Sequence, residues 1–221
     1  MARAAPTGTV EAVLSLLDSA DLLGRCRYVE LAAFSLLGRR ASGCEGPAVV
    51  AYLAGASLAH GWRAGQLEAL LPVSTGLPGA AELTRSPAAS TDLALELATA
   101  PGGDAELLDA VLGAIYPSMS AGYAERLSAV SPAADPPVAR TLRRLLADLE
   151  ELRREGELVA RGLPVPEPRR RRAVEDALAQ AGGLFGPLAP GEGAERASGV
   201  SGPASRSPGR MPGGGRAGPG D

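Results

Sequence analysis

The sequence predicts an all-α protein, a four-helix bundle with a long connection between its second and third helices and a disordered C-terminal tail. Four long segments carry apolar residues at alternating spacings of three and four, which is typical of helix faces that pack in a bundle. No segment alternates apolar and polar residues for long enough to indicate a strand. Because aromatic residues make up only 3% of the 221 residues, the core must be built from Leu, Ala and Val.

The first two long helices are predicted over residues 21–40 and about 47–71. Before them, Thr7 or Thr9 is a candidate cap for a short helix ending at Leu17, and residues 18–21 interrupt it or start the next helix. Proline suits the first turn of a helix, so Pro47 marks the start of the second one. The short turn between them makes the pair antiparallel.

The third and fourth long helices are predicted over about 104–130 and 137–162. Pro117 should kink the third helix or mark its effective end, because proline lacks the N–H that a helix interior requires. The connection 72–103 contains a short helix near 90–100 and is long enough to cross the bundle. The third helix can therefore begin at either end of the first pair.

The remaining chain divides into two parts after a bundle domain at 9–163. Residues 164–185 are expected to be a linker with a short arginine-rich helix from about Pro168 to Ala181, stopped by the glycines that follow. About half of the residues from 187 onward are Gly or Pro. Such a composition cannot bury enough apolar area to fold, so 186–221 are expected to be disordered.

The charged residues exclude several classes of chemistry. All 22 basic residues are Arg, Lys and Asn are absent, and there is one His. The chain therefore has no P-loop lysine, no lysine Schiff base and no zinc site that needs two histidines. Residues 1–163 hold 19 acidic residues against 14 Arg, a poor balance for binding nucleic acid.

We expect a cytoplasmic protein with no membrane partner. Acidic residues in the N-terminal apolar run argue against a signal peptide, and no apolar stretch approaches the roughly 20 residues of a membrane span. Cys26 and Cys44 lie far apart in the sequence and are expected to be free thiols, although a bridge between them is an alternative.

Two halves of the predicted bundle resemble each other at an offset of 90 residues. Glu45 then aligns with Asp135, and Pro47 with Pro137. In each half a helix is followed by a short turn, an acidic residue, a proline and a second helix. Both a duplication and a chance match of two amphipathic hairpins remain open.

Glu30 and His60 are the polar residues that stand out on the apolar faces. Glu30 has apolar neighbours one and two turns away in both directions, and His60 lies in the middle of the second helix's stripe. If the first two helices are antiparallel, both residues lie at similar heights. A carboxylate in such surroundings needs a partner, because burying it alone costs several kcal/mol.

These features resemble the ferritin-like superfamily, in particular actinobacterial ferritin-like four-helix proteins. The similarity covers about residues 20–163 and includes the segments Tyr28-Val29-Glu30-Leu31 and His60-Gly61-Trp62-Arg63. It implies a ferritin-like four-helix bundle. In metal-binding members, each half supplies a Glu followed by a Glu-x-x-His pair.

Only part of that ligand set is present in this chain. Glu30 and His60 match the first Glu and the first His, whereas Ser57 stands where the paired Glu should be. Ser120 stands where the second half should supply its Glu. The fourth helix offers two acids but no His, so the candidate metal ligands are Glu30, His60, Asp148 and Glu151.

Three interpretations of Glu30 and His60 follow. The two residues satisfy each other, or backbone and water, in an apolar core; they hold a reduced iron or manganese site; or they perform acid–base work on a small molecule. Ser57 can also hydrogen bond to His60, but a mid-helix serine has no oxyanion donors, which argues against a serine hydrolase.

The sequence therefore favours a vestigial, non-catalytic ferritin-like protein that acts as a binding or interaction module without a cofactor. Its expected partners are a second copy bound through helix faces or another protein. The alternative is a metal-dependent oxidase or hydroxylase. The run Arg169–Arg172 is a solvated helix face or, in a third hypothesis, helps the tail bind RNA or an acidic partner.

Overall fold

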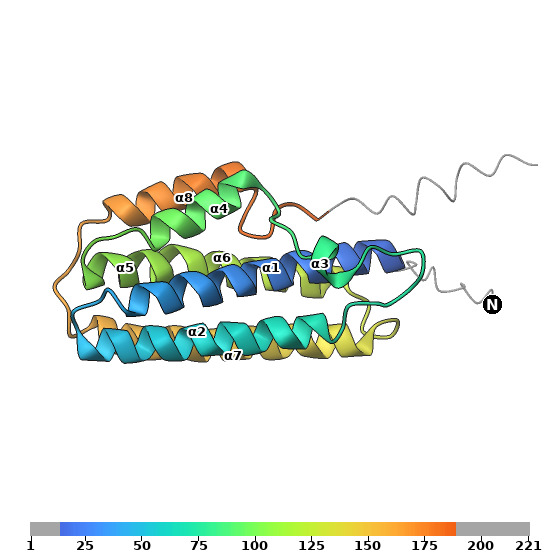
Figure 1. The fold of residues 1–221 in the computed structure, drawn as a ribbon, viewed down its shortest axis with the longest axis horizontal. Coiled ribbons are helices and arrows are strands. Elements are labelled where there is room, and N and C mark those ends of the chain that lie inside the picture. Colours follow the sequence, from blue (N-terminus) through green and yellow to red (C-terminus); the bar gives the residue numbers. More distant parts are fainter. Residues whose placement is uncertain (1–13, 189–221) are drawn as a thin grey trace, which may run out of the picture. The chain divides into compact units, whose positions relative to one another are not determined.

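The computed structural model describes residues 14–188, which form helices and no strands (Figure 1). The first helix, α1, spans Leu16–Ala41, and α2 spans Pro47–Glu68. The connection that follows contains one turn of helix, α3 at Ala80–Leu83, and the longer α4 at Ala89–Ala98. The remaining elements are α5 (Asp104–Ala110), η1 (Val111–Ile115), α6 (Tyr116–Ala129), α7 (Pro136–Ala160) and α8 (Arg169–Ala181).

The N-terminal helix begins earlier than the sequence predicts. Ser15 caps α1 by accepting a hydrogen bond from the Asp18 N–H, while the Asp18 carboxylate accepts from the Ser15 N–H. This reciprocal capping box satisfies two N–H groups that a helix start leaves free. The helix continues through residues 18–21, so they do not interrupt it; they lie near the start of α1, close to the other alternative that the sequence allows. Thr7 and Thr9 lie outside the described residues.

The third rod, α5–η1–α6, begins beside the turn that joins α1 and α2. The Asp104 carboxylate accepts hydrogen bonds from the backbone N–H groups of Glu45, at 3.2 Å, and Gly46, at 2.8 Å. Because α2 and α5 both start at this end, they run in the same direction. The connection through α3 and α4 therefore crosses the length of the first pair, one of the two alternatives that the sequence allows.

The third helix does not end at Pro117; instead, a π-helical turn, η1, comes just before the proline. In η1 the Tyr116 N–H donates to the Val111 carbonyl, five residues back. Proline cannot donate and its ring crowds the carbonyl four residues earlier, so a locally wider turn accommodates it. The next turn contains Tyr116, whose ring is fully buried.

The arginine-rich helix α8 packs into the protein and is more than part of a linker. It lies beside α4 (Figure 1), and its apolar face is buried through Val174, Ala177 and Leu178. Gly182 ends α8 in the left-handed conformation, with φ of 69°, as the glycine signal predicts. Leu184 and Phe185, which follow, are also buried in the core.

The four arginines of the run have different surroundings. Arg171 pairs with Asp109 of α5 at 3.0 Å, and Arg170 donates to the Pro101 carbonyl at 3.0 Å. Arg169 is exposed and pairs with Glu167. Two of the four side chains therefore help to dock α8, which leaves a smaller free basic surface than the sequence suggests.

Several other expectations are settled by the described residues. Cys26 and Cys44 are both free thiols. No described helix combines the length and the apolar character that crossing a membrane requires. The predicted disordered region 186–221 lies outside the described residues except for Gly186 to Leu188.

Candidate functional site

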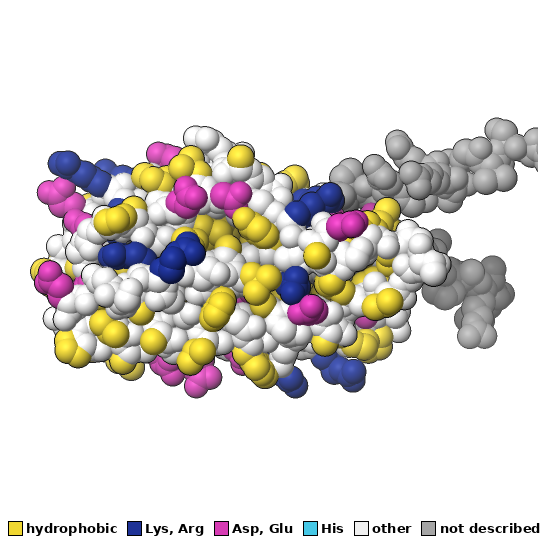
Figure 2. Space-filling view, viewed as in Figure 1, with side chains coloured by type: hydrophobic (Ala, Val, Ile, Leu, Met, Phe, Trp, Pro, Cys, Tyr) yellow, Lys and Arg dark blue, Asp and Glu magenta, His cyan; other side chains and the backbone are white. Residues whose placement is uncertain are grey.

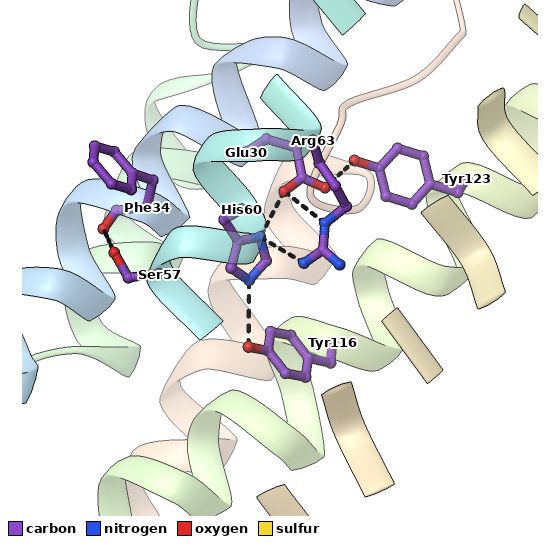
Figure 3. A network of polar contacts seen from close by, with 7 residues as sticks. All are labelled: Glu30, Phe34, Ser57, His60, Arg63, Tyr116 and Tyr123. Atoms are coloured by element: carbon purple, nitrogen blue, oxygen red, sulfur yellow. Dashed lines mark hydrogen bonds and ion pairs between the residues drawn. The ribbon is translucent and has the colours of Figure 1, made fainter. Parts of the chain in front are cut away.

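Glu30 and His60 meet in the interior, where α1 packs against α2. The Nδ1 atom of His60 lies 2.6 Å from the Oε2 atom of Glu30, and both side chains are fully buried. The antiparallel turn places the two residues at the same height, as the sequence predicts. Figure 3 shows that both point into a cluster shared with residues from α6 and from the junction of η1 and α6.

Arg63, one turn after His60 on α2, supplies a cation to the same carboxylate. Its Nε donates to Glu30 Oε2 at 3.3 Å, and the side chain is buried. Its Nη2 also lies 3.2 Å from His60 Nδ1. Since the shorter contact requires Nδ1 to carry the hydrogen that Glu30 accepts, we assign the Nδ1–H tautomer to His60.

Two tyrosines complete the cluster. The hydroxyl of Tyr123 donates to Glu30 Oε1 at 2.5 Å. The hydroxyl of Tyr116 lies 3.3 Å from His60 Nε2 and donates to it in the assigned tautomer. Both carboxylate oxygens of Glu30 and both ring nitrogens of His60 therefore have partners within the protein.

The cluster is electrically neutral at neutral pH. Burial lowers the pKa of His60, the Glu30 carboxylate only partly offsets this, and the Arg63 charge lowers it further. Burial alone would raise the pKa of Glu30, but His60, Arg63 and the Tyr123 hydrogen bond together lower it. A neutral imidazole thus accompanies one carboxylate and one guanidinium, a combination that a dry interior tolerates far better than a single charge.

These shifts predict a protein that loses stability on acidification. His60 in the folded state has a pKa below its ordinary 6.5, so the unfolded chain binds the proton first. The free energy of unfolding should therefore fall as pH drops below 6.5, by at most about 1.4 kcal/mol per pH unit for this one proton. Glu30, whose pKa is lowered from 4.5, adds a further loss below that value.

Urea unfolding at pH 7.5, 6.0 and 5.0 measures this dependence, with His60→Gln as the matched variant. Glutamine keeps hydrogen-bonding capacity but does not titrate, so its unfolding free energy should change less over this range. A wild-type protein equally stable at the three pH values would contradict the assigned protonation state.

The cluster does not fit a metal ion. An ion needs ligand atoms that are not already engaged, whereas each carboxylate oxygen of Glu30 and each ring nitrogen of His60 has a hydrogen-bond partner within the protein. The guanidinium of Arg63 already places a positive charge on the carboxylate, which would repel a second cation. Among residues 14–188, no three His, Cys, Asp or Glu side chains gather as a metal site requires.

The two acids predicted on the fourth helix lie apart from this cluster. Asp148 on α7 is partly exposed, and Glu151 is exposed. The buried face of α7 instead carries Leu145, Leu149 and Leu152. The four predicted ligands are thus not assembled: the structure brings Glu30 and His60 together and leaves Asp148 and Glu151 outside.

The two serines considered at the sequence level have other roles. Ser57 donates its hydroxyl to the Phe34 carbonyl of α1 at 2.7 Å, and no hydrogen bond joins it to His60. Ser120 is partly buried, and the α6 residue that contacts Glu30 is Tyr123.

Sequence reasoning missed Arg63, Tyr116 and Tyr123 as members of the cluster. One signal was available: Arg63 lies three residues after His60, on the same side of the helix. The two tyrosines, seven residues apart, share one face of the third rod. Tyrosines are common in protein cores, and an arginine three residues after a histidine is common on helices. Neither spacing by itself therefore indicates a polar cluster.

Two open grooves lie elsewhere on the described part of the protein. One, of about 420 Å³, lies between the third rod and α7 and is lined by Asp109, Pro117 and Arg153, among others. Another, of about 540 Å³, includes Gly46, Asp104 and Pro164. Neither is lined by Glu30 or His60.

Comparisons with protein-family models, curated proteins and solved structures found no match to this chain. The fold and the cluster therefore describe the protein only in structural terms. Its described residues form an all-helical protein with a buried, neutral polar cluster in its core.

Proposed function

We propose that the chain is a ferritin-like helical-bundle protein without a catalytic centre, which acts as an interaction module. The observation that carries this proposal is that the polar side-chain atoms of Glu30 and His60 all have partners within the buried cluster. Every oxygen of Glu30 and every ring nitrogen of His60 is engaged, and Arg63 supplies the cation. A site that holds a reactive metal or substrate needs open positions.

The topology supports the ferritin-like part of the proposal. Helices α2 and α5–α6 run in the same direction and are joined by a long crossover, as in the bundles of that superfamily. The position of the Glu30–His60 pair between the first two helices agrees with the expected ligand position. On this proposal, Arg63, Tyr116 and Tyr123 bind the Glu30 and His60 atoms that would bind a metal ion in a metal-binding relative.

The surface supports the interaction part. On the outer side of α2, Leu58 is 70% exposed and Trp62 is 55% exposed, and neither has a charged neighbour on that side of the helix. Large apolar side chains that stay accessible to solvent on adjacent turns are typical of surfaces that bind other proteins. The proposed binding surface is therefore the outer face of α2 and not the buried cluster.

Metal analysis tests this function. The purified protein is incubated with Fe²⁺ or Mn²⁺ at pH 7, desalted, and analysed by mass spectrometry of the elements. We expect far less than one metal ion per chain, equal in the wild type and in Glu30→Gln. About one iron or manganese per chain would contradict the proposal, and its loss in Glu30→Gln would place that metal on the cluster.

A further inference from the structure

The outer face of α2, together with its C-cap residue Ala69, carries a stripe of six exposed, uncharged residues, hereafter the α2 stripe. Its spacings are four, three, four, three and four, so all six lie along one line of the helix. Its only large side chains are Leu58 and Trp62, at the centre. The stripe consists of Ala51, Gly55, Leu58, Trp62, Gly65 and Ala69.

Charge is absent from the exposed part of α2 over most of its length. The only charged residue between Pro47 and Leu67 is Arg63, which is buried in the Glu30 cluster. Glu68, at the end of the helix, is already paired with Arg27 of α1 at 3.0 Å. Figure 2 shows hydrophobic side chains along the lower front of the view, where α2 lies. A partner that binds this face therefore needs no charged residues to pair with α2.

The two glycines of the stripe serve no visible purpose within the chain. A Cβ atom at Gly55 or at Gly65 would meet nothing within 4 Å. Alanine at an exposed helical position is favoured over glycine by about 0.5–1 kcal/mol, so packing within the chain does not explain either residue. The close approach of a second backbone would explain both.

The stripe is symmetric about residue 60. Turned end over end, it places Trp62 on Leu58, Gly65 on Gly55 and Ala69 on Ala51. In an antiparallel pair of identical helices around a two-fold axis, each residue meets its mirror position in the partner. Large residues then meet large ones at the centre, and small residues meet small ones at both ends.

We propose that the α2 stripe is the interface of an antiparallel homodimer, with a two-fold axis beside residue 60. This inference rests on the proposed interaction function and names its partner as a second copy of the chain. Phe34 of α1 is 40% exposed and its ring lies against Gly61, so it widens the apolar surface beside the stripe.

The dimer should be a weak one. From Ala51 to Ala69 the stripe is about 27 Å long at 1.5 Å per residue. A single pair of helices of this length buries an area near the lower limit of stable interfaces, which is ~1,200 Å² in total. We therefore expect dissociation on dilution through the micromolar range.

Sedimentation velocity of the full chain over a range of concentrations measures the association. The wild type should be dimeric at the highest concentrations, whereas Leu58→Arg and Trp62→Glu should each be monomeric, because each buries two charges against apolar partners. Leu158→Arg, at an exposed leucine of α7, is the control and should remain dimeric. Circular dichroism confirms that each variant is folded.

Mixing the two monomeric variants tests the register. In the antiparallel dimer, position 58 of one chain meets position 62 of the other. The mixture therefore places the new arginine beside the new glutamate and leaves one wild-type Leu58–Trp62 contact. A 1:1 mixture should form heterodimers, whereas a parallel dimer would pair neither charge.

The outcomes separate this inference from the proposed function. A wild type that stays monomeric at several hundred micromolar, or a dimer that survives Leu58→Arg, overturns the α2 homodimer. Failure of the mixture to associate overturns the antiparallel register. None of these results bears on metal content, so the non-catalytic assignment fails only through the metal analysis.

Discussion

Replacing Glu30 with alanine should lower the free energy of unfolding by about 3–5 kcal/mol. The substitution leaves the buried Arg63 guanidinium without its carboxylate and removes the acceptors of the His60 and Tyr123 hydrogen bonds. An unpaired charge in a dry core is among the most destabilising defects that one substitution can create. Urea or thermal unfolding at pH 7.5 measures the loss.

The control is Glu151→Ala on α7, at an exposed acid that the sequence also places among the candidate ligands. Its effect should stay within about 0.5 kcal/mol. The double variant Glu30→Gln/Arg63→Met removes both charges together and should be destabilised by less than the sum of its two single variants. Equal losses for Glu30→Ala and Glu151→Ala would contradict the structural role of the cluster.

Phe185→Ala should lower the free energy of unfolding by about 3–5 kcal/mol. The Phe185 ring packs on Tyr123 with ring centroids 4.8 Å apart, and the Arg126 guanidinium lies 4.8 Å from the Phe185 centroid. Arg126 also donates to the carbonyls of Phe185, at 2.9 Å, and Gly186, at 3.0 Å. Removing the ring leaves a cavity and loosens the segment after α8.

Thermal unfolding measures this effect, with Val165→Ala at a fully exposed position as the control. We expect a clear drop in Tm for Phe185→Ala and little change for Val165→Ala. The same packing means that a chain ending at Leu163 would lack α8 and expose the core that it covers. Removing residues 164–221 would therefore affect folding as well as any function of the tail. A Phe185→Ala protein as stable as the wild type would contradict the role of this segment.

The positions of the helices could be predicted from the sequence because their signals are local. Alternating apolar residues identified the long helices, Pro47 marked the start of α2, and Gly182 marked the end of α8. The N-terminal boundary was missed because Ser15 and Asp18 form a capping box inside a stretch that resembles a break. The packing of α8 was missed because its four leading arginines suggest a solvated helix.

Of the residues in the candidate site, only the Glu30–His60 pair could be predicted from the sequence. Counting residues from a short turn placed Glu30 and His60 at one height, and the two side chains are in contact. The remaining partners depend on how the third rod is rotated against α2, which no local pattern determines. Arginine is also expected at the surface, so Arg63 was not anticipated in the core.

We propose that His60 is a neutral member of the buried cluster and does not bind a metal ion. The chain has a single histidine, so every imidazole signal in a nitrogen NMR spectrum belongs to His60. At pH 7 we expect one protonated ring nitrogen, Nδ1, hydrogen bonded to Glu30, and a spectrum that Mn²⁺ or Co²⁺ leaves unchanged. A doubly protonated ring at pH 7, or selective broadening or shifting of these signals by either ion, would contradict it.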